Sequence, residues 1–107
     1  MTNKNNILYT NTQPSLCIPR IEKGVREKDI FDVFKRLSFG EVERVDIVSW
    51  KKNTSENQFV RVFIHFKFWN DHTENIRKKL LSGCSFNIVH DFPWFWKIVA
   101  SRLPKPN

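Results

Sequence analysis

Residues 59–66 constrain the fold of this chain more than any other segment, because they alternate between two chemically different faces. At the two-residue period of a β-strand, the even positions are all apolar: Val60, Val62, Ile64 and Phe66. The odd positions are Phe59, Arg61, Phe63 and His65. The apolar set is typical of a buried face. Two rings, a guanidinium and an imidazole form a poor core but a good surface for stacking on nucleic-acid bases.

Further helices and strands are predicted on both sides of this strand. In chain order we expect a strand over residues 15–21, a helix over 26–39, strands over 42–50 and 58–69, a helix starting near Asn70 and ending at Gly83, a short strand over 86–89 and a last strand over 94–101. The order is β-α-β-β-α-β, with an extra short strand before the last one. It predicts an α/β (α+β plait) fold of ferredoxin-like type, with a four-stranded antiparallel sheet, both helices on one face and the other face open.

The two helical segments carry recognisable signals. In the first, apolar residues follow the i, i+3, i+4, i+7 spacing of an amphipathic helix: Ile30, Val33, Phe34 and Leu37. Gly40 follows and suits the left-handed position that ends a helix. The second segment starts with three capping residues, Asn70, Asp71 and Thr73, and places Ile76 and Leu80 on its buried side. Its basic cluster, Arg77-Lys78-Lys79, is expected to form a solvated face.

Charge and cysteine content narrow the functional classes. The net charge of +7 favours a polyanionic partner. The N-terminus lacks the apolar run of a signal peptide, and no segment approaches the roughly 18–20 apolar residues of a membrane span. Cys17 and Cys84 lie far apart and outside any Cys/His cluster, so we expect no disulfide, no metal and no cofactor. These features predict a soluble, intracellular protein that does not bind membranes.

With this element order, the chain resembles the RNA-recognition motif family over residues 14–102, between a flexible arm (residues 1–13) and a tail (103–107). The family's longer motif reads [KR]-G-[FY]-[GA]-[FY]-[VI]-x-[FY], and Phe63-Ile64-His65-Phe66 matches its second half. The first half departs from the motif, with Phe59, Val60, Arg61 and Val62 at its four positions. The shorter motif, [VIL]-[FY]-[VIL]-x-N-L, aligns with residues 16–21, where Cys17 replaces the stacking aromatic and Arg20 replaces the asparagine.

The resemblance implies binding of single-stranded RNA or DNA through the open sheet face, with low sequence specificity. The expected nucleic-acid-binding residues are Phe63, Arg61, Lys97, Phe95, Lys51, Lys52 and Arg20. Phe63 would stack on a base, and Arg61 would stack or hold a phosphate. The lysines would follow the phosphate backbone, and Phe95 would offer a second stacking platform.

The last strand leaves two arrangements open. If Trp94, Trp96, Ile98 and Ala100 face the helices, the open face receives Phe95, Lys97 and Val99. With the opposite parity, the two tryptophans form the platform. Ile98 and Ala100 are better core residues than Lys97 and Ser101, which favours the first arrangement.

A second resemblance is to small uncharacterised proteins of large nucleocytoplasmic DNA viruses. It is carried by four segments, residues 17–20, 43–48, 61–66 and 91–97. For a viral protein this implies a place in the host cytoplasm, in the virus factory or in the virion. The resemblance implies an origin and no mechanism.

The main alternative is a protein–protein interaction module of the same fold without RNA binding, because exposed aromatic residues with weakened stacking motifs suit that role equally well. Arg61 has its own alternative, an ion pair with Asp46 on the neighbouring strand. No Ser/His/Asp, Cys/His or paired-carboxylate arrangement stands out in the sequence, and we expect a protein that is not an enzyme.

Overall fold

The structure is a computed structural model, and it describes residues 11–49, 59–91 and 94–101. Within these residues the chain forms β1 (Leu16–Glu22), α1 (Glu27–Leu37), β2 (Gly40–Ser49), β3 (Phe59–Trp69), α2 (Glu74–Leu81), β4 (Phe86–Asp91) and β5 (Trp94–Ala100). A turn of 3-10 helix, η2 (Asp71–Thr73), precedes α2. The order and type of these elements agree with the sequence prediction, and their ends differ from it by a few residues.

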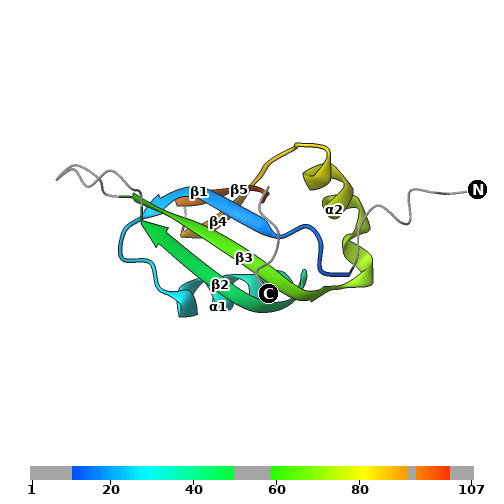
Figure 1. The fold of residues 1–107 in the computed structure, drawn as a ribbon, viewed down its shortest axis with the longest axis horizontal. Coiled ribbons are helices and arrows are strands. Elements are labelled where there is room, and N and C mark those ends of the chain that lie inside the picture. Colours follow the sequence, from blue (N-terminus) through cyan, green and yellow to red (C-terminus); the bar gives the residue numbers. More distant parts are fainter. Residues whose placement is uncertain (1–10, 50–58, 92–93, 102–107) are drawn as a thin grey trace, which may run out of the picture.

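The strands form one open antiparallel sheet in the order β2-β3-β1-β5-β4 (Figure 1). The prediction of four strands was wrong, because the extra short strand, β4, pairs along β5 and becomes the edge of the sheet. In this pairing Ile88 lies opposite Trp96, and both side chains are buried. The added strand β4 belongs to the sheet because its buried side chain Ile88 extends the apolar face beyond β5.

One face of the sheet follows the alternation predicted for residues 59–66. The apolar side chains of β3 at Val60, Val62, Ile64 and Phe66 are buried. They share one hydrophobic core with residues of β1 and with Ile30 and Phe34 of α1. The rings of Phe34 and Phe66 meet edge to face, with centroids 6.1 Å apart. In Figure 1, α1 runs below the strands, so this face of the sheet is the one that the helix covers.

The ends of α1 are set by residues that the sequence signals did not single out. At the start, the backbone N–H of Arg26 donates to Asp29 Oδ2 (2.9 Å), while the Arg26 guanidinium binds the same carboxylate (Nη2 to Oδ1, 3.1 Å). At the end, Ser38 takes the left-handed conformation (φ 58°), so the prediction that Gly40 does so was wrong. Gly40 instead begins β2, where a Cβ would clash with the carbonyl oxygen of Phe68.

The C-terminal end of β3 changes which side chains are buried. The β2–β3 register shifts on either side of Val42, which lies opposite Phe66. After this irregularity Trp69 is buried (3 % exposed) and Phe68 is not (40 %). The Trp69 ring stacks on Phe66 with centroids 4.2 Å apart. The register shift thus adds Trp69 to the hydrophobic core beyond the Val42–Phe66 pair.

The helix α2 lies at the end of the sheet where β1 begins and β3 ends (Figure 1). Leu80 is buried as predicted, and Gly83 has the positive φ (100°) expected just beyond the helix. The solvated basic face was predicted correctly for Lys78 and Lys79 but not for Arg77. Arg77 is buried because its guanidinium donates to the carbonyl oxygen of Gln13 from both Nε (2.8 Å) and Nη2 (2.6 Å).

The predicted N-terminal arm, residues 1–13, is described only from Asn11 onward. In that part, the backbone N–H of Trp69 donates to the carbonyl oxygen of Asn11 (2.9 Å). Together with the Arg77–Gln13 contact, this bond fixes the segment before β1 against the end of the sheet. Within residues 11–49, 59–91 and 94–101, no helix is long and apolar enough to cross a membrane.

Candidate nucleic-acid interface

The candidate interface is the face of the sheet opposite α1. On β3 it carries Phe59, Arg61 and Phe63, which are all half-buried. The register places Phe63 opposite Cys17 of β1 and opposite Asp46 of β2. Because alternate residues of a strand lie about 7 Å apart, Arg61 and Phe63 present a guanidinium and a ring at neighbouring positions on one surface.

Arg20 enters this surface through an irregularity in β1. The β1–β3 register shifts between Ile18 and Ile21, so that both isoleucines are buried and Arg20, between them, is exposed. Its guanidinium carbon lies 4.0 Å from the centroid of the Phe59 ring, in cation–π geometry. One face of that ring is therefore covered, and a ligand approaching from that side meets Arg20 first.

The last strand has the first of the two predicted arrangements. Trp96 and Ile98 are buried, whereas Phe95 (55 % exposed) and Lys97 are on the surface. The β1–β5 register places Val99 opposite Cys17, on the face that carries Phe63. Because β1 lies between β5 and β3, the strand that carries Lys97 is two strand spacings, about 10 Å, from the strand that carries Arg61.

Two expected site residues, Lys51 and Lys52, lie outside the described residues. The other five are described, and the sheet register brings four of them onto one face: Phe63, Arg61, Lys97 and Phe95. Arg20 joins this face at its edge through the Phe59 ring. The basic residues Arg20 and Lys97 are exposed, as phosphate contacts would require.

His65 belongs to this face by strand parity, but it is buried (2 % exposed) and therefore offers no stacking surface. Its Nδ1 lies 2.8 Å from Ser15 Oγ, and its Nε2 lies 3.5 Å from Asp46 Oδ2. The carboxylate favours the proton on Nε2, so that the serine hydroxyl donates to Nδ1. The sequence did not reveal this Ser/His/Asp arrangement, because Ser15 precedes β1, Asp46 lies on β2 and His65 on β3, far apart along the chain.

The exposure of these three residues decides what they can do. A nucleophilic serine must be reached by substrate, with its base held from behind by a buried carboxylate. Here Ser15 and His65 are both buried, and Asp46 is the most exposed of the three. We therefore interpret the arrangement as a buried hydrogen bond between Ser15 and His65 that joins the start of β1 to β3, with the partly exposed Asp46 carboxylate of β2 beside the ring.

Asp46 has a second cationic neighbour on its own strand. Arg44 Nε donates to Asp46 Oδ1 at 2.8 Å. The register places Arg61 opposite Val48 and Asp46 opposite Phe63. Arg44 Nε and His65 Nε2 both lie within 4 Å of the Asp46 carboxylate, at 2.8 Å and 3.5 Å.

Both cysteines are free thiols, Cys17 buried and Cys84 exposed. Burial raises the pKa of the Cys17 thiol above its ordinary value, and the positive charge of Arg61 opposes this in part. Cys17 thus stays protonated at neutral pH and fills the position of the missing aromatic as a small apolar side chain. In the part of the chain that the structure describes, no group of three His, Cys, Asp or Glu residues could hold a metal ion.

These features define an α/β protein with an open antiparallel sheet of five strands and two helices. Its exposed sheet face mixes rings and cations. Beyond this class, comparison finds no matching family model, no similar curated protein and no similar solved structure.

Proposed function

We propose that this protein binds single-stranded nucleic acid, RNA in the first place, on the open face of its sheet and without catalysis. The observation that carries the proposal is the grouping of Phe63, Arg61, Phe95 and Lys97 on one face. Rings that stack on bases and cations that neutralise phosphates are the two components of single-strand binding surfaces. The net charge of +7 agrees with a polyanionic ligand.

We also propose that the fold is a ferredoxin-like plait similar to the RNA-recognition motif, with β4 as an addition. The supporting feature is the position of the two motif-like segments. They lie on β1 and β3, which are adjacent in the middle of the sheet, with Cys17 opposite Phe63. This is the arrangement in which both segments contribute to one binding surface.

Within this surface, Phe63 is the principal stacking residue. A base–aromatic stack contributes about 1–3 kcal/mol, equivalent to a change of about 5- to 150-fold in affinity. With Cys17 in place of a second ring, the binding energy depends more on Arg61, Lys97 and Arg20. For about four neutralised phosphates, the log of the affinity falls with the log of the salt concentration with a slope near −3.

A tryptophan-fluorescence titration with a random-sequence single-stranded RNA, at about 0.15 M salt and at higher salt, tests the proposal. Wild type is compared with Phe63→Ala and with Leu81→Ala, which removes an equally apolar but exposed side chain on α2. We expect saturable binding that weakens with salt, a loss of about 5-fold or more in Phe63→Ala, and no change in Leu81→Ala.

The charge contribution is tested with Lys97→Ala against Lys79→Ala, which removes an exposed lysine from α2. Lys97→Ala should weaken binding and reduce the salt slope by about 0.7, whereas Lys79→Ala should leave both unchanged. Equal effects of the two lysine variants, with full binding by Phe63→Ala, would mean that charge alone attracts RNA and that the sheet face does not bind it.

A second candidate function, a protein-interaction module, is favoured by one observation. Val89 and Phe95 form a cross-strand pair on β4 and β5 and are 58 % and 55 % exposed. Exposed apolar pairs near a sheet edge are common in protein interfaces. No RNA binding at tens of micromolar, together with a stable complex that Phe95→Ala disrupts, would favour this function.

A further inference from the structure

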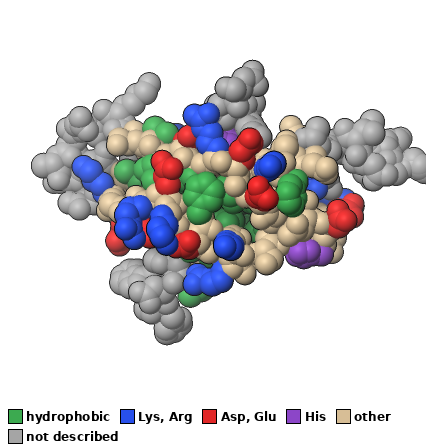
Figure 2. Space-filling view, turned by 90° about the horizontal axis from the view of Figure 1, so that it is seen from below, with side chains coloured by type: hydrophobic (Ala, Val, Ile, Leu, Met, Phe, Trp, Pro, Cys, Tyr) green, Lys and Arg blue, Asp and Glu red, His purple; other side chains and the backbone are tan. Residues whose placement is uncertain are grey.

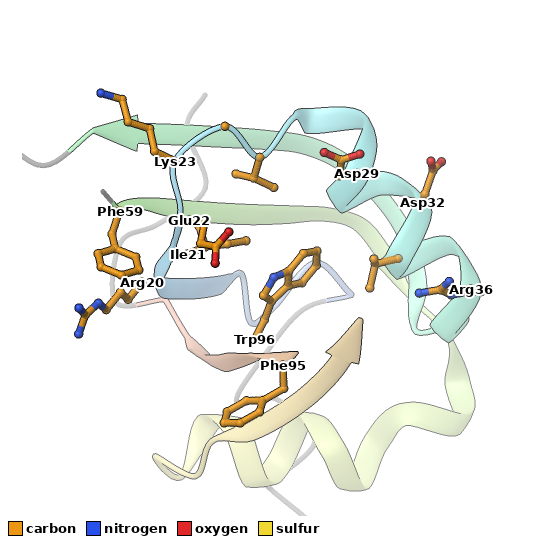
Figure 3. Close-up of a pocket in the computed structure, with 13 residues that line it drawn as sticks. Arg20, Ile21, Glu22, Lys23, Asp29, Asp32, Arg36, Phe59, Phe95 and Trp96 are labelled. Carbon is orange, nitrogen blue, oxygen red and sulfur yellow. The ribbon is translucent and has the colours of Figure 1, made fainter. Parts of the chain in front are cut away.

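A hollow of about 1010 Å³ opens at the edge of the sheet beside the β1–α1 turn, and residues of α1, β1, β3 and β5 line it. Its apolar floor is formed by Ile21, Val33 and the indole of Trp96, all of which are nearly buried. In Figure 3 the Trp96 ring lies in the middle of the lining residues, with Arg36 beyond it on α1, and only 7 % of Trp96 is exposed. The volume is sufficient for a ligand of nucleotide size.

Three cations and three carboxylates line the hollow: Arg20, Lys23 and Arg36 against Glu22, Asp29 and Asp32. The two aspartates that line it are already engaged, Asp29 with Arg26 (3.1 Å) and Asp32 with Lys28 (2.8 Å). Among the described residues, no carboxylate forms an ion pair with Arg36. The α1 side of the hollow therefore presents a positive charge next to an aromatic floor.

The opposite side of the hollow has a different character. Glu22 lines it between Phe59 and Trp96, and its carboxylate can only accept hydrogen bonds (Figure 3). A phosphate would be repelled there, whereas a hydroxyl or an amino group would be held. Figure 2, seen from the side on which α1 lies in Figure 1, shows hydrophobic side chains surrounded by both signs of charge.

We propose that this hollow is a second ligand site that binds one nucleotide, with its base against the Trp96 floor, its phosphate at Arg36 and a hydroxyl or amino donor at Glu22. An apolar floor, a cation and an acceptor at separate positions match the three chemical parts of a nucleotide. The proposal goes beyond sheet binding, because neither Phe63 nor Arg61 lines the hollow.

The hollow also adjoins the sheet face at its edge. Phe59, Arg20 and Phe95 line it, and the same three residues border the candidate interface. The ligand has two possible sources with the same chemistry: a free mononucleotide, or the terminal nucleotide of a strand that continues over this edge.

The experiment follows the tryptophan indole N–H signals in ¹H–¹⁵N correlation spectra of the full chain, with Trp96 assigned from Trp96→Phe. The probes are adenosine 5′-monophosphate, adenosine and inorganic phosphate, each to about 10 mM. We expect a saturable shift of the Trp96 signal with the monophosphate, binding about 10-fold weaker for adenosine and no saturation with phosphate alone. No shift of the Trp96 signal with the monophosphate would overturn the proposal.

Arg36→Glu and Lys35→Glu are a matched pair, because both residues are exposed in the last turn of α1 and only Arg36 lines the hollow. Arg36→Glu should weaken monophosphate binding by at least 10-fold and Lys35→Glu by less than 2-fold, with both spectra otherwise preserved. Equal weakening would show general charge attraction and overturn the site.

Two further comparisons separate this site from the sheet interface. Monophosphate binding should persist in Phe63→Ala, because Phe63 does not line the hollow. The nucleotide site can therefore be confirmed even if the sheet does not bind RNA. Loss of monophosphate binding in a folded Phe63→Ala variant would contradict a separate site. A 5′-phosphorylated trinucleotide that shifts Trp96 at lower concentration than the monophosphate identifies a strand end as the ligand. Equal or weaker binding of the trinucleotide identifies the free nucleotide.

Discussion

The Nδ1 atom of His65 lies 2.8 Å from the hydroxyl oxygen of Ser15, across fifty residues of sequence. The bond joins the residue just before β1 to the middle of β3, and both side chains are buried. The two-residue period of β3 predicts that His65 lies on the exposed face, but its imidazole is buried against Ser15. The bond reduces the binding surface around Phe63 and stabilises the strand pair that carries it.

Ser15→Ala should destabilise the protein by about 1–3 kcal/mol, because it leaves His65 Nδ1 buried without its hydroxyl partner. Urea unfolding followed by circular dichroism at pH 7.5 measures this free energy. Ser85→Ala, at an exposed serine, is the control and should change the stability by less than about 0.5 kcal/mol. Equal stabilities of the two variants would show that the His65–Ser15 bond contributes nothing net.

Phe66→Ala and Phe63→Ala remove the same side chain from opposite faces of β3. Phe66 is fully buried between Phe34 and Trp69, so its truncation should cost about 3–5 kcal/mol. Phe63 is half-buried on the open face, so its truncation should reduce the free energy of unfolding by clearly less. Thermal and urea unfolding of both variants check the order, and equal losses would mean that the two faces of β3 are misassigned.

Gly40→Ala should be more destabilising than Gly24→Ala, for a different physical reason. At Gly40 the new Cβ would overlap the Phe68 carbonyl group and push β2 away from β3, at a cost of about 1–3 kcal/mol or more. At Gly24 the space is open, and only the positive φ (104°) opposes alanine, at about 1–2 kcal/mol. Unfolding free energies of the two variants test this order. A larger loss in Gly24→Ala than in Gly40→Ala would contradict the close approach of Gly40 to the Phe68 carbonyl.

The two thiols should differ in reactivity in the folded protein. Cys84 is exposed, whereas Cys17 is buried and its pKa is raised, which lowers its thiolate fraction at neutral pH. With a disulfide reagent at pH 7.5, one thiol should react quickly and the other at least about 10-fold more slowly, and Cys84→Ser should abolish the fast phase. In denaturant both should react fast. A fast Cys17 in the folded Cys84→Ser variant would contradict its burial.

The pair of Arg26 and Asp29 should make stability pH-dependent in the acid range. Hydrogen bonds from the Arg26 side chain, and then from its backbone N–H, lower the pKa of Asp29 below its ordinary 3.8. Because the folded-state pKa is the lower one, the stabilisation is fully present above about pH 4 and is lost as the pH falls through the folded value. The stability difference between wild type and Asp29→Asn should shrink between pH 6 and pH 2.5.

The control for this prediction is Glu27→Gln, which removes the other acidic residue in the first turn of α1 and leaves the Arg26–Asp29 pair intact. Urea unfolding of the three proteins at both pH values gives the comparison. A difference between wild type and Asp29→Asn that stays constant, or grows, as the pH falls would contradict the capping role of the ionised carboxylate.

The sequence predicted the order of the described elements because each carries its own periodicity. The alternation over residues 59–66 predicted the burial of Val60, Val62, Ile64 and Phe66 but not that of His65, and the helical spacing predicted Ile30 and Phe34. Local patterns failed where a register shift intervenes. Trp69 is buried in place of Phe68 because the β2–β3 register changes near Val42, and period two carries no information about such a shift.

The candidate site was predicted in part. Period two left two arrangements of the last strand open, and the apolar character of Ile98 and Ala100 favoured the one that the structure has, with Phe95 and Lys97 on the surface and Trp96 in the core. Period two could not show that Arg20 covers the Phe59 ring, since this contact depends on the irregularity between Ile18 and Ile21. Nor did it reveal the hollow at Trp96, whose walls come from α1, β1 and β5.

The sequence by itself determined the succession of strands and helices and the two chemical faces of β3, because both are encoded by side-chain period within one segment. Only the tertiary structure decided that β4 completes the sheet, that His65 is buried against Ser15, and that Arg77 is buried by binding the carbonyl of Gln13. The partners of β4 lie 3 to 12 residues away on β5, and those of His65 and Arg77 lie 50 and 64 residues away. The burial of a polar side chain is decided by whether such a partner satisfies its hydrogen bonds, and no local pattern specifies that partner.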